Sequence, residues 1–276
     1  MTPPSLPPSL PHRDNLIHRS SEPWRPPVFR HPSKRRIDWM AALRRFPDLQ
    51  AASIWRDLKL LLKSCQGAVL DVGCGAQPYR SLLPSGVHYV GIDTTDANSH
   101  FGYSMPDTLY FDGTTWPIAS GSINTVIATE TLEHVDRPQS FLSEARRVLK
   151  PEGWLVLTVP FSARWHFIPH DYWRFTPSGL RTVLTDAGFS VPVVYARGNE
   201  VTVACYKVMA ILLLLLLGQW DFPLTRWIAR MTGGVLLPMV FGLAILGQLS
   251  LRSRGGNDCL GYTAIASKPA LKPQEV

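Results

Sequence analysis

The stretch Val69-Leu70-Asp71-Val72-Gly73-Cys74-Gly75-Ala76 decides the fold of this chain. It is an apolar strand that runs into a glycine-rich turn, and a second apolar strand, Tyr89-Val90-Gly91-Ile92-Asp93, ends in a carboxylate. An α/β sheet with this pattern binds an adenosine-containing cofactor at the carboxyl ends of its strands, because the glycines let the backbone approach the ligand. We therefore expect Asp93 to accept hydrogen bonds from both hydroxyls of a ribose.

The turn itself narrows the choice of cofactor. A dinucleotide-binding turn has the pattern G-x-G-x-x-G, in which the third glycine lets a helix pack closely behind a pyrophosphate. Here the turn reads Gly73-Cys74-Gly75-Ala76-Gln77-Pro78, so proline stands at the third position. The turn therefore suits a ligand without a pyrophosphate, and Cys74 is expected to fill space rather than to act as a nucleophile.

Strand and helix patterns alternate around this turn. Residues 40–62 have apolar side chains at helical spacing, interrupted by Pro47, and predict one or two helices. The other predicted elements are strands at residues 68–72, 88–92, 108–111, 123–129, 154–159, 191–195 and 261–269, a short helical turn at residues 79–83, and helices at residues 138–149 and 177–187. The alternation predicts an α/β fold, a Rossmann-like, seven-stranded and mostly parallel sheet with helices on both faces.

Two apolar runs form an insertion before the last predicted strand. Residues 201–217 end in six consecutive leucines, and residues 233–251 are nearly uncharged. Both ends of the insertion must return to one sheet, so a membrane-bound insertion is either a transmembrane hairpin or a shallow or re-entrant docking pair. A hairpin would export Arg226 and Arg230, against the positive-inside tendency. The alternative is a buried or dimer-forming helical pair.

The composition of the chain limits the classes of protein to which it can belong. The chain has 276 residues and a formal net charge of +7. Much of this excess lies in residues 12–36, which carry seven basic and two acidic side chains, so it describes a tail rather than an active site. Residues 1–37 are rich in proline and lack the apolar core of a signal peptide, which predicts a disordered basic arm. Four cysteines without CxxC spacing are expected to be free thiols in a reducing compartment.

Five pieces of sequence, in order along the chain, carry a resemblance to a known family. They are Leu70-Asp-Val-Gly-Cys-Gly75, Val90-Gly-Ile-Asp93, Thr129-Glu-Thr-Leu-Glu-His-Val135, Glu144-Ala-Arg-Arg-Val-Leu-Lys-Pro151 and Leu157-Thr-Val-Pro160. In order and spacing they resemble the class I S-adenosylmethionine (SAM) dependent methyltransferases of the type 11 group. The resemblance covers residues 69–189, and residues 261–269 resemble the closing strand. Two positions depart from the group, which usually has aspartate in place of Asn124 and glycine in place of Glu152.

The resemblance implies SAM as the cofactor and assigns roles by position. The implied cofactor-binding residues are Asp71, Gly73 and Gly75 at the methionine end, Asp93 at the ribose, Asp112 and Gly113 at the adenine amino group, and Glu130 near the transferable methyl. For Asp112 the alternative is an ordinary turn aspartate beside Gly113.

The chemistry of methyl transfer selects the candidate catalytic residues. A sulfonium donor releases a neutral leaving group, so catalysis can rest mostly on alignment and proximity. An oxygen nucleophile also gains from a base that removes its proton. The candidate catalytic residues are His134, Glu130, His166 and Asp171. The alternative for His134 is that it only braces a loop.

Residues 166–176 follow the fifth predicted strand and are dense in polar and aromatic side chains. This block resembles one found in methyltransferases of sugar-polymer and lipid pathways, and the predicted acceptor-binding residues are His170, Tyr172 and Arg174. Arg174 could neutralise a phosphate or a carboxylate. The alternative is that Arg174 forms a structural pair with Asp171, while Thr176 caps the next helix.

Glu130-x-x-Glu133-His134 also resembles a metal-binding pattern of some O-methyltransferases, which use Mg²⁺ or a similar ion to hold vicinal hydroxyls. Histidine is a poor ligand for Mg²⁺, and type 11 proteins with this Leu-Glu-His-Val sequence mostly need no metal. We therefore predict no metal.

These observations predict a methyltransferase domain over residues 38–200 and 256–270, with residues 201–255 as a hydrophobic helical insertion that docks on or crosses a membrane. The expected activity is SAM-dependent methylation of an oxygen of an amphipathic small molecule, lipid or lipid-linked glycan at the cytoplasmic face of a membrane. No nucleic-acid partner is expected. The alternatives are a non-catalytic, membrane-anchored binding module of the same fold, and a metal-assisted RNA 2′-O-methyltransferase, which the basic arm favours.

Overall fold

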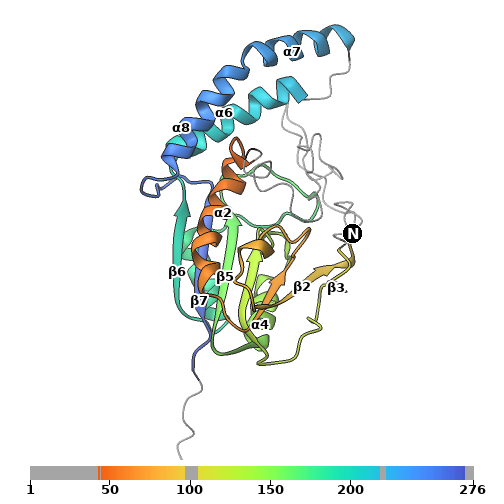
Figure 1. The fold of residues 1–276 in the computed structure, drawn as a ribbon, viewed down its shortest axis with the longest axis vertical. Helices are drawn as coiled ribbons and strands as arrows, with labels where there is room; N and C mark the ends of the chain where they lie inside the picture. The colour runs from red at the N-terminus through yellow and green to blue at the C-terminus, as the bar shows by residue number, and fades with distance from the viewer. Residues whose placement is uncertain (1–42, 44, 97–104, 218–221, 271–276) are drawn as a thin grey trace, which may run out of the picture.

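The computed structural model describes residues 43, 45–96, 105–217 and 222–270 (Figure 1). The predicted arm of residues 1–37 lies outside the described residues. The first residues of the helical pattern predicted over residues 40–62 also lie outside the described residues, except for Leu43.

The described residues form one sheet of seven strands. These are β1 (Ala68–Val72), β2 (His88–Thr94), β3 (Thr108–Phe111), β4 (Ile123–Thr129), β5 (Leu149–Pro160), β6 (Ser190–Arg197) and β7 (Gly261–Ser267). Their order across the sheet is β3-β2-β1-β4-β5-β7-β6. Strands β1 to β5 pair in parallel, whereas β7 runs antiparallel to both of its neighbours, β5 and β6. The predicted seven-stranded, mostly parallel sheet is confirmed, including the return of the last strand beside β6.

Helices cover both faces of the sheet, as predicted. Helix α2 (Leu49–Leu61) begins at Asp48, whose carboxylate accepts a hydrogen bond from the backbone N–H of Ala51 at 3.0 Å. It packs with Ile54 and Leu58 against one face. Helices α4 (Pro138–Val148) and α5 (Pro177–Asp186) bury their apolar sides in the larger core on the other face. The short helical turn predicted at residues 79–83 is the single 3₁₀ turn η3 (Arg80–Leu82).

Strand β5 begins earlier than residues 154–159 predict. Its first residues pair with β4 across a shift in register, so the strand starts at Leu149, directly after α4. Within this irregular start Glu152 has a φ of +61°, a left-handed conformation that favours glycine. This explains why the type 11 group usually has glycine there. Asn124, the other departure, accepts hydrogen bonds from the backbone of Ala68 and from the Lys150 ammonium group.

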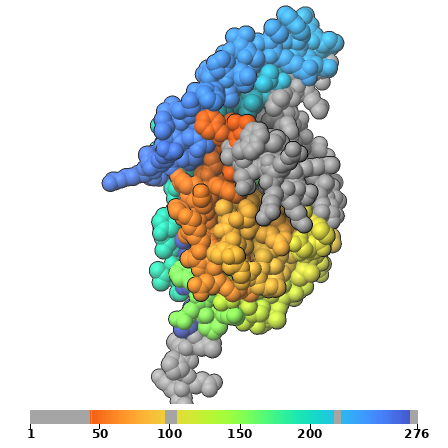
Figure 2. Space-filling view, in the orientation of Figure 1, coloured from red at the N-terminus to blue at the C-terminus, as the bar shows by residue number. Residues whose placement is uncertain are grey.

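The insertion forms an arm of three helices, α6 (Glu200–Leu217), α7 (Pro223–Val235) and α8 (Leu237–Ser250). The apolar run of residues 233–251 is therefore broken at Leu236, where α7 and α8 bend by 51°. Among the described residues no single helix is long and apolar enough to cross a membrane, although this bent pair passes the same test jointly. The arm extends beyond the sheet and leads away from the strand ends (Figures 1 and 2).

The base of the arm is fixed to the sheet and to α2. Strands β6 and β5 run in the same direction, so α6 leaves the sheet at the edge where the parallel strands end. Leu49 of α2 packs so closely against Gly247 of α8 that an added Cβ would lie 2.4 Å from its methyl group. The Gln248 side chain also donates to the Phe46 carbonyl at 2.8 Å. These contacts attach the arm beside the carboxyl edge of the sheet.

Candidate active site at the carboxyl edge of the sheet

The glycine turn after β1 is held against β2 by its own backbone. The N–H groups of Gly73 and Cys74 both donate to the Ile92 carbonyl, at 2.9 and 3.2 Å. Gly73 and Gly75 have φ values of +66° and +52°. A Cβ on Gly73 would lie 2.6 Å from the Thr131 hydroxyl, so only glycine fits between these two strand ends. The backbone is therefore open to a ligand on this edge.

Cys74 is buried within the turn, and burial raises the pKa of its thiol to about 12. It lies 3.5 Å from the Thr108 hydroxyl. A thiol in this setting stays protonated and fills space, which agrees with the expectation from the sequence. All four cysteines are free and buried.

Asp93 ends β2 directly beside the turn. Its carboxylate accepts hydrogen bonds from the Gly75 N–H at 2.9 Å and from the Thr94 N–H at 2.8 Å. Burial raises its pKa, while these two hydrogen bonds act in the opposite direction. Asp93 thus shapes the turn and also lines the cavity described below.

Asp71 is placed differently from its predicted role. It is buried within β1, and its carboxylate accepts a hydrogen bond from the Tyr89 hydroxyl at 2.9 Å. Burial raises the pKa of Asp71 to about 7. Its side chain braces β1 against β2 behind the turn, so a direct contact with the cofactor stays a prediction.

Asp112 lies in an exposed loop after β3. Its carboxylate accepts hydrogen bonds from the Thr114 N–H at 2.9 Å and from the Thr114 hydroxyl at 2.7 Å, which lower its pKa. This is the geometry of a turn aspartate, the alternative considered above. Gly113 and Thr114 nevertheless line the cavity, so the loop itself reaches the site.

Glu130 follows β4 with a φ of +48°. Its carboxylate forms an ion pair with Arg197 at 2.7 Å. Arg197 ends β6 and is completely buried; it also donates to the Val159 carbonyl at 3.0 Å and to the Ser53 hydroxyl at 3.1 Å. Arg197 therefore ties the side chain of Glu130 to β5, β6 and α2 at once.

His134 lies at the end of the short 3₁₀ turn η4 (Leu132–His134) and faces the loop of residues 166–170. Its Nδ1 lies 2.6 Å from the His170 carbonyl oxygen, and its ring packs edge-on against His166 and Phe167. Burial lowers the pKa of His134 to about 4. The imidazole is therefore neutral near pH 7, with Nδ1 donating and Nε2 carrying the lone pair.

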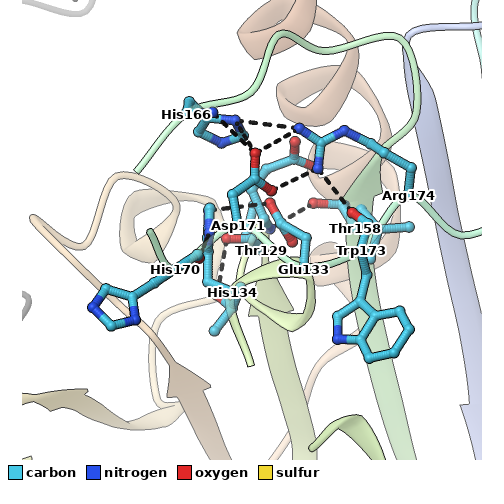
Figure 3. A network of polar contacts seen from close by, with 12 residues as sticks. Thr129, Glu133, His134, Thr158, His166, His170, Asp171, Trp173 and Arg174 are labelled. Atoms are coloured by element: carbon cyan, nitrogen blue, oxygen red, sulfur yellow. Dashed lines mark hydrogen bonds and ion pairs between the residues drawn. The ribbon is translucent and has the colours of Figure 1, made fainter. Parts of the chain in front are cut away.

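The block of residues 166–176 is built around a buried ion pair (Figure 3). Arg174 donates to both carboxylate oxygens of Asp171, at 2.6 and 2.8 Å, and His166 donates through its backbone N–H at 3.0 Å. The arginine and the histidine lower the pKa of Asp171 despite its burial. Thr176 caps α5 by accepting from the Gly179 N–H. The structural alternative considered for Asp171, Arg174 and Thr176 is therefore present in the molecule.

This network has consequences for the predicted acceptor and base residues. The Arg174 guanidinium also donates to the carbonyls of Arg164 and Trp173, which commits it to the loop. Asp171 is almost fully buried, which removes it from contact with a substrate in this arrangement. Tyr172 and His170 are exposed and lie 3.2 Å apart through the hydroxyl and Nδ1. Among the acceptor candidates these two are the accessible ones.

Glu133 is a buried acid beside this network. It is fully buried, and neither carboxylate oxygen has a hydrogen-bond partner within the described part of the chain. Burial, followed by the charge of Glu130, raises its pKa. Side-chain ligand atoms of Glu133, His134 and His166 lie within 4.8 Å of one another, so these residues could hold a metal ion. The expectation that no metal is required stays a prediction.

A cavity of about 680 Å³ joins these pieces at the carboxyl edge of the sheet. Its size suits a ligand with the dimensions of a nucleoside cofactor. Five of the predicted residues line it, namely Gly73, Asp93, Gly113, Glu130 and His134. Its other lining residues include Thr131, Trp116, Phe141 and Phe167, none of which the sequence singled out. The cavity thus brings the glycine turn together with His134 from the acceptor side.

Arg197 is the main functional residue that sequence reasoning missed. A signal was present, because an arginine that ends an otherwise apolar strand needs a partner when buried. The partner could not be named, since Glu130 lies 67 positions away in the chain.

Comparison with known proteins agrees with this geometry. Residues 70–157 match the protein family described as a methyltransferase domain. An uncharacterized methyltransferase of Mycolicibacterium gilvum is 31% identical over 96 residues, which cover 33% of this chain and 38% of that protein. A ubiquinone biosynthesis O-methyltransferase of Maricaulis maris is 26% identical over 152 residues, which cover 45% of this chain and 59% of that protein. These matches thus span about half of the length of the curated relatives.

Among solved structures, a SAM-dependent methyltransferase from Archaeoglobus fulgidus is similar, with a TM-score of 0.49 at 16% identity. The similarity covers 84% of this chain and 100% of that chain.

Proposed function

Residues 70–157 belong to the type 11 family of class I SAM-dependent methyltransferase domains, and from this membership we propose that the protein transfers a methyl group from SAM to an oxygen of an amphipathic acceptor at a membrane. The acceptor class we propose is a lipid, a lipid-linked glycan or a similar small molecule, reached from the cytoplasmic face. The proposal rests on one observation: the glycine turn, Asp93, Glu130 and His134 all line the same cavity.

The residues of the turn fit the cofactor. Gly73 leaves open the space that a Cβ would fill against Thr131. Asp93 is fixed by two backbone N–H groups, and the remaining acceptor capacity of its carboxylate suits the ribose hydroxyls. When bound, SAM supplies an electrophilic methyl group and a neutral thioether leaving group. Catalysis by the protein therefore rests on alignment of the acceptor.

His134 is our candidate for the group that takes the proton of an acceptor hydroxyl. With Nδ1 bonded to the His170 carbonyl, the ring orientation is fixed and the lone pair lies on Nε2, which is 3.6 Å from Oε1 of Glu133. The lowered pKa of about 4 keeps this nitrogen unprotonated at neutral pH, although it also makes the imidazole a weak base. An oxygen acceptor gains from such a group because its proton must leave as the new bond forms.

The membrane part of the proposal is supported by the arm. It leaves the sheet at the edge that carries the cavity, and its helices expose many large apolar side chains. An acceptor with an apolar tail would then be presented beside the site. The relative from Maricaulis maris, whose printed name describes an O-methyltransferase of ubiquinone biosynthesis, is compatible with an acceptor of this class.

Calorimetric titration of the full chain in mild detergent with SAM tests the core of the proposal. We expect binding by the wild type and a loss of at least about tenfold in affinity for Asp93→Ala, since two hydrogen bonds of the ribose would be lost. Asp186→Ala, an exposed aspartate at the end of α5, is the matched control and should bind normally. No binding by the folded wild type would refute the proposal.

A further inference from the structure

Helix α7 carries an apolar stripe that no described part of the protein covers. Its residues are Leu224, Trp227, Ile228, Met231 and Val235, with side chains between 50% and 75% exposed. At about 100° per residue this spacing places all five on one side of the helix. A helix whose apolar side faces outward needs a partner that supplies an apolar environment.

The opposite side of α7 is fixed to the arm. Ala229 and Gly233 are buried, and a Cβ on Gly233 would lie 3.0 Å from Leu216 of α6. The close approach at Gly233 determines which way the helix faces. Because these small residues lie across the helix from the stripe, the stripe points away from the other described residues. At the same 100° per residue, the exposed Arg230 lies next to the stripe, whereas Arg226 lies nearer to Gly233.

The apolar surface continues along α8. Leu237, Met239 and Phe241 are about half exposed or more at its start, and Ile245, Leu246 and Leu249 follow. From Phe222 to Asn257 the sequence contains four arginines and no aspartate or glutamate. The surface is therefore both apolar and positively charged, and α7 lies beyond the strand ends (Figure 1).

We propose that α7 and the adjoining half of α8 insert into one leaflet of an anionic bilayer, with α7 lying in the plane of the headgroups. The inference rests on the proposed function and names the partner of its arm. An in-plane amphipathic helix places an apolar stripe at the acyl boundary and flanking arginines at the phosphates. The excess of basic over acidic side chains in residues 222–257 favours an anionic lipid surface over a second copy of the chain, because a second copy would carry the same excess of positive charge.

The inference has a geometric consequence for the active site. Helix α6 starts three residues after the carboxyl end of β6, and α8 leads back to β7 at the same edge. A leaflet bound to the arm therefore lies on the side of the sheet where the strands end. Asn199, which accepts from Ser250 at 2.7 Å, and Thr202, 2.8 Å from the same hydroxyl, tie the two arm helices together at this edge.

Flotation of the full chain with vesicles tests the inference. We expect binding to vesicles of phosphatidylcholine with phosphatidylglycerol, and weaker binding to phosphatidylcholine alone. Arg230→Gln should weaken binding to the anionic vesicles about 5-fold. Trp227→Glu should weaken it by about tenfold or more, because an aromatic side chain that inserts into the bilayer would be replaced by a charged one. Val191→Glu is the matched control, since Val191 is 80% exposed at the opposite edge of the sheet.

Depth and sidedness separate an in-plane helix from a hairpin. The four native cysteines are buried, so Met231→Cys can be labelled with an environment-sensitive dye or with a bulky maleimide. We expect quenching by headgroup-proximal quenchers and reaction from the outer side only. Quenching at the bilayer centre, or labelling from inside the vesicles, would overturn the in-plane placement.

Two further outcomes complete the test. A wild type that binds no vesicles but sediments as a dimer, with Trp227→Glu monomeric, would assign the stripe to a second copy and overturn the inference. Calorimetry with SAM on the same samples keeps the two proposals apart. Normal SAM binding without vesicle binding refutes only the membrane inference, whereas vesicle binding without SAM binding refutes only the proposed cofactor function.

Discussion

Glu130 and Arg197 form the most constrained residue pair at the site. Arg197 is completely buried and has hydrogen bonds to β5 and α2 in addition to its ion pair with Glu130. Its Nε atom has no partner among the described residues. A buried ion pair adds little net stability, but removal of one partner leaves a charge without compensation. The pair therefore acts as a positioning device for Glu130 at the cavity wall.

Arg197→Met should lower the free energy of unfolding by about 3 kcal/mol, because Glu130 and the Val159 carbonyl would lose their donor. Urea denaturation measures this, and SAM titration should show weaker binding in the folded fraction. The double variant Arg197→Met/Glu130→Gln should recover part of the stability, since the unpaired charge is gone. Arg181→Met, on the exposed side of α5, is the control. An Arg197→Met protein as stable as the wild type would contradict the argument.

His134 makes the stability of the fold depend on pH. In the unfolded chain its imidazole takes up a proton near pH 6.5, whereas burial lowers its pKa in the folded protein to about 4. The unfolded state binds more protons between these values, so the free energy of unfolding falls as the pH is lowered from about 6.5 to about 4. The contribution of His134 to this fall is up to about 3 kcal/mol.

Comparison of the wild type with His134→Gln isolates this contribution. Glutamine does not titrate, so the difference in unfolding free energy between the two proteins should change steadily across pH 6.5 to 4 and stay constant above it. His166 works in the opposite direction, because its pKa is raised through Asp171 and the Arg164 carbonyl despite burial. Because its ring packs against His134, the two proteins are compared in a His166→Gln background, in which His166 makes no contribution. A pH-independent difference would refute the assigned pKa shift.

At the scale of the elements, the start of β5 places a residue other than glycine in a left-handed backbone conformation. Glu152 is exposed and held at a φ of +61°, and its N–H donates to the Lys268 carbonyl at 2.9 Å. Glu152→Gly should raise the free energy of unfolding by about 1 kcal/mol, because glycine adopts this conformation without strain from a Cβ. Thermal and urea denaturation measure the change.

The control for this prediction is Glu152→Ala. Alanine keeps the Cβ and therefore the strain, so it should give no comparable gain. Equal stabilisation by alanine and glycine would show that the glutamate side chain, rather than the backbone conformation, is responsible.

The elements also show which parts of the structure the sequence could predict. Strands β1 to β4 are local apolar runs that end in turn residues, and their predicted bounds agree with the structure to within two residues. The break at Leu236 was missed although the sequence carries a signal for it: Pro238 lies in the first turn of α8, a position that proline favours, and Gly233 and Gly234 precede the break. The early start of β5 depends on pairing with β4, which is a tertiary effect.

Some residues of the candidate site could also be predicted from the sequence, and others could not. Gly73 and Asp93 were predictable, because a turn and a strand end place them at the edge through local chain geometry. The bidentate pairing of Arg174 with Asp171, three positions apart, could be considered from the sequence as an alternative. The contacts of Glu130 with Arg197 and of Gly73 with Thr131 could not, because they join segments brought together only by the sheet.

At the scale of the whole molecule, the arm separates into a packed base and an exposed outer part. The base has its own core, in which Leu49 of α2 joins Val203, Met209, Val240 and Ala244. Beyond it, most large side chains of α7 and α8 are exposed. The base should therefore keep its packing when the outer part is removed, since little apolar area is buried there.

Replacement of residues 214–239 by a short glycine-serine linker tests this division. We expect affinity for SAM to stay within about twofold and the unfolding midpoint to change little, because the cavity and the packed base are retained. Association with anionic vesicles should be lost, and methyl transfer to an acceptor embedded in vesicles should fall by at least about tenfold because the acceptor is no longer concentrated beside the site. A short-chain, water-soluble analogue of the same acceptor should be methylated at the wild-type rate. Loss of activity on both substrates would instead mean that the outer arm shapes the cavity itself.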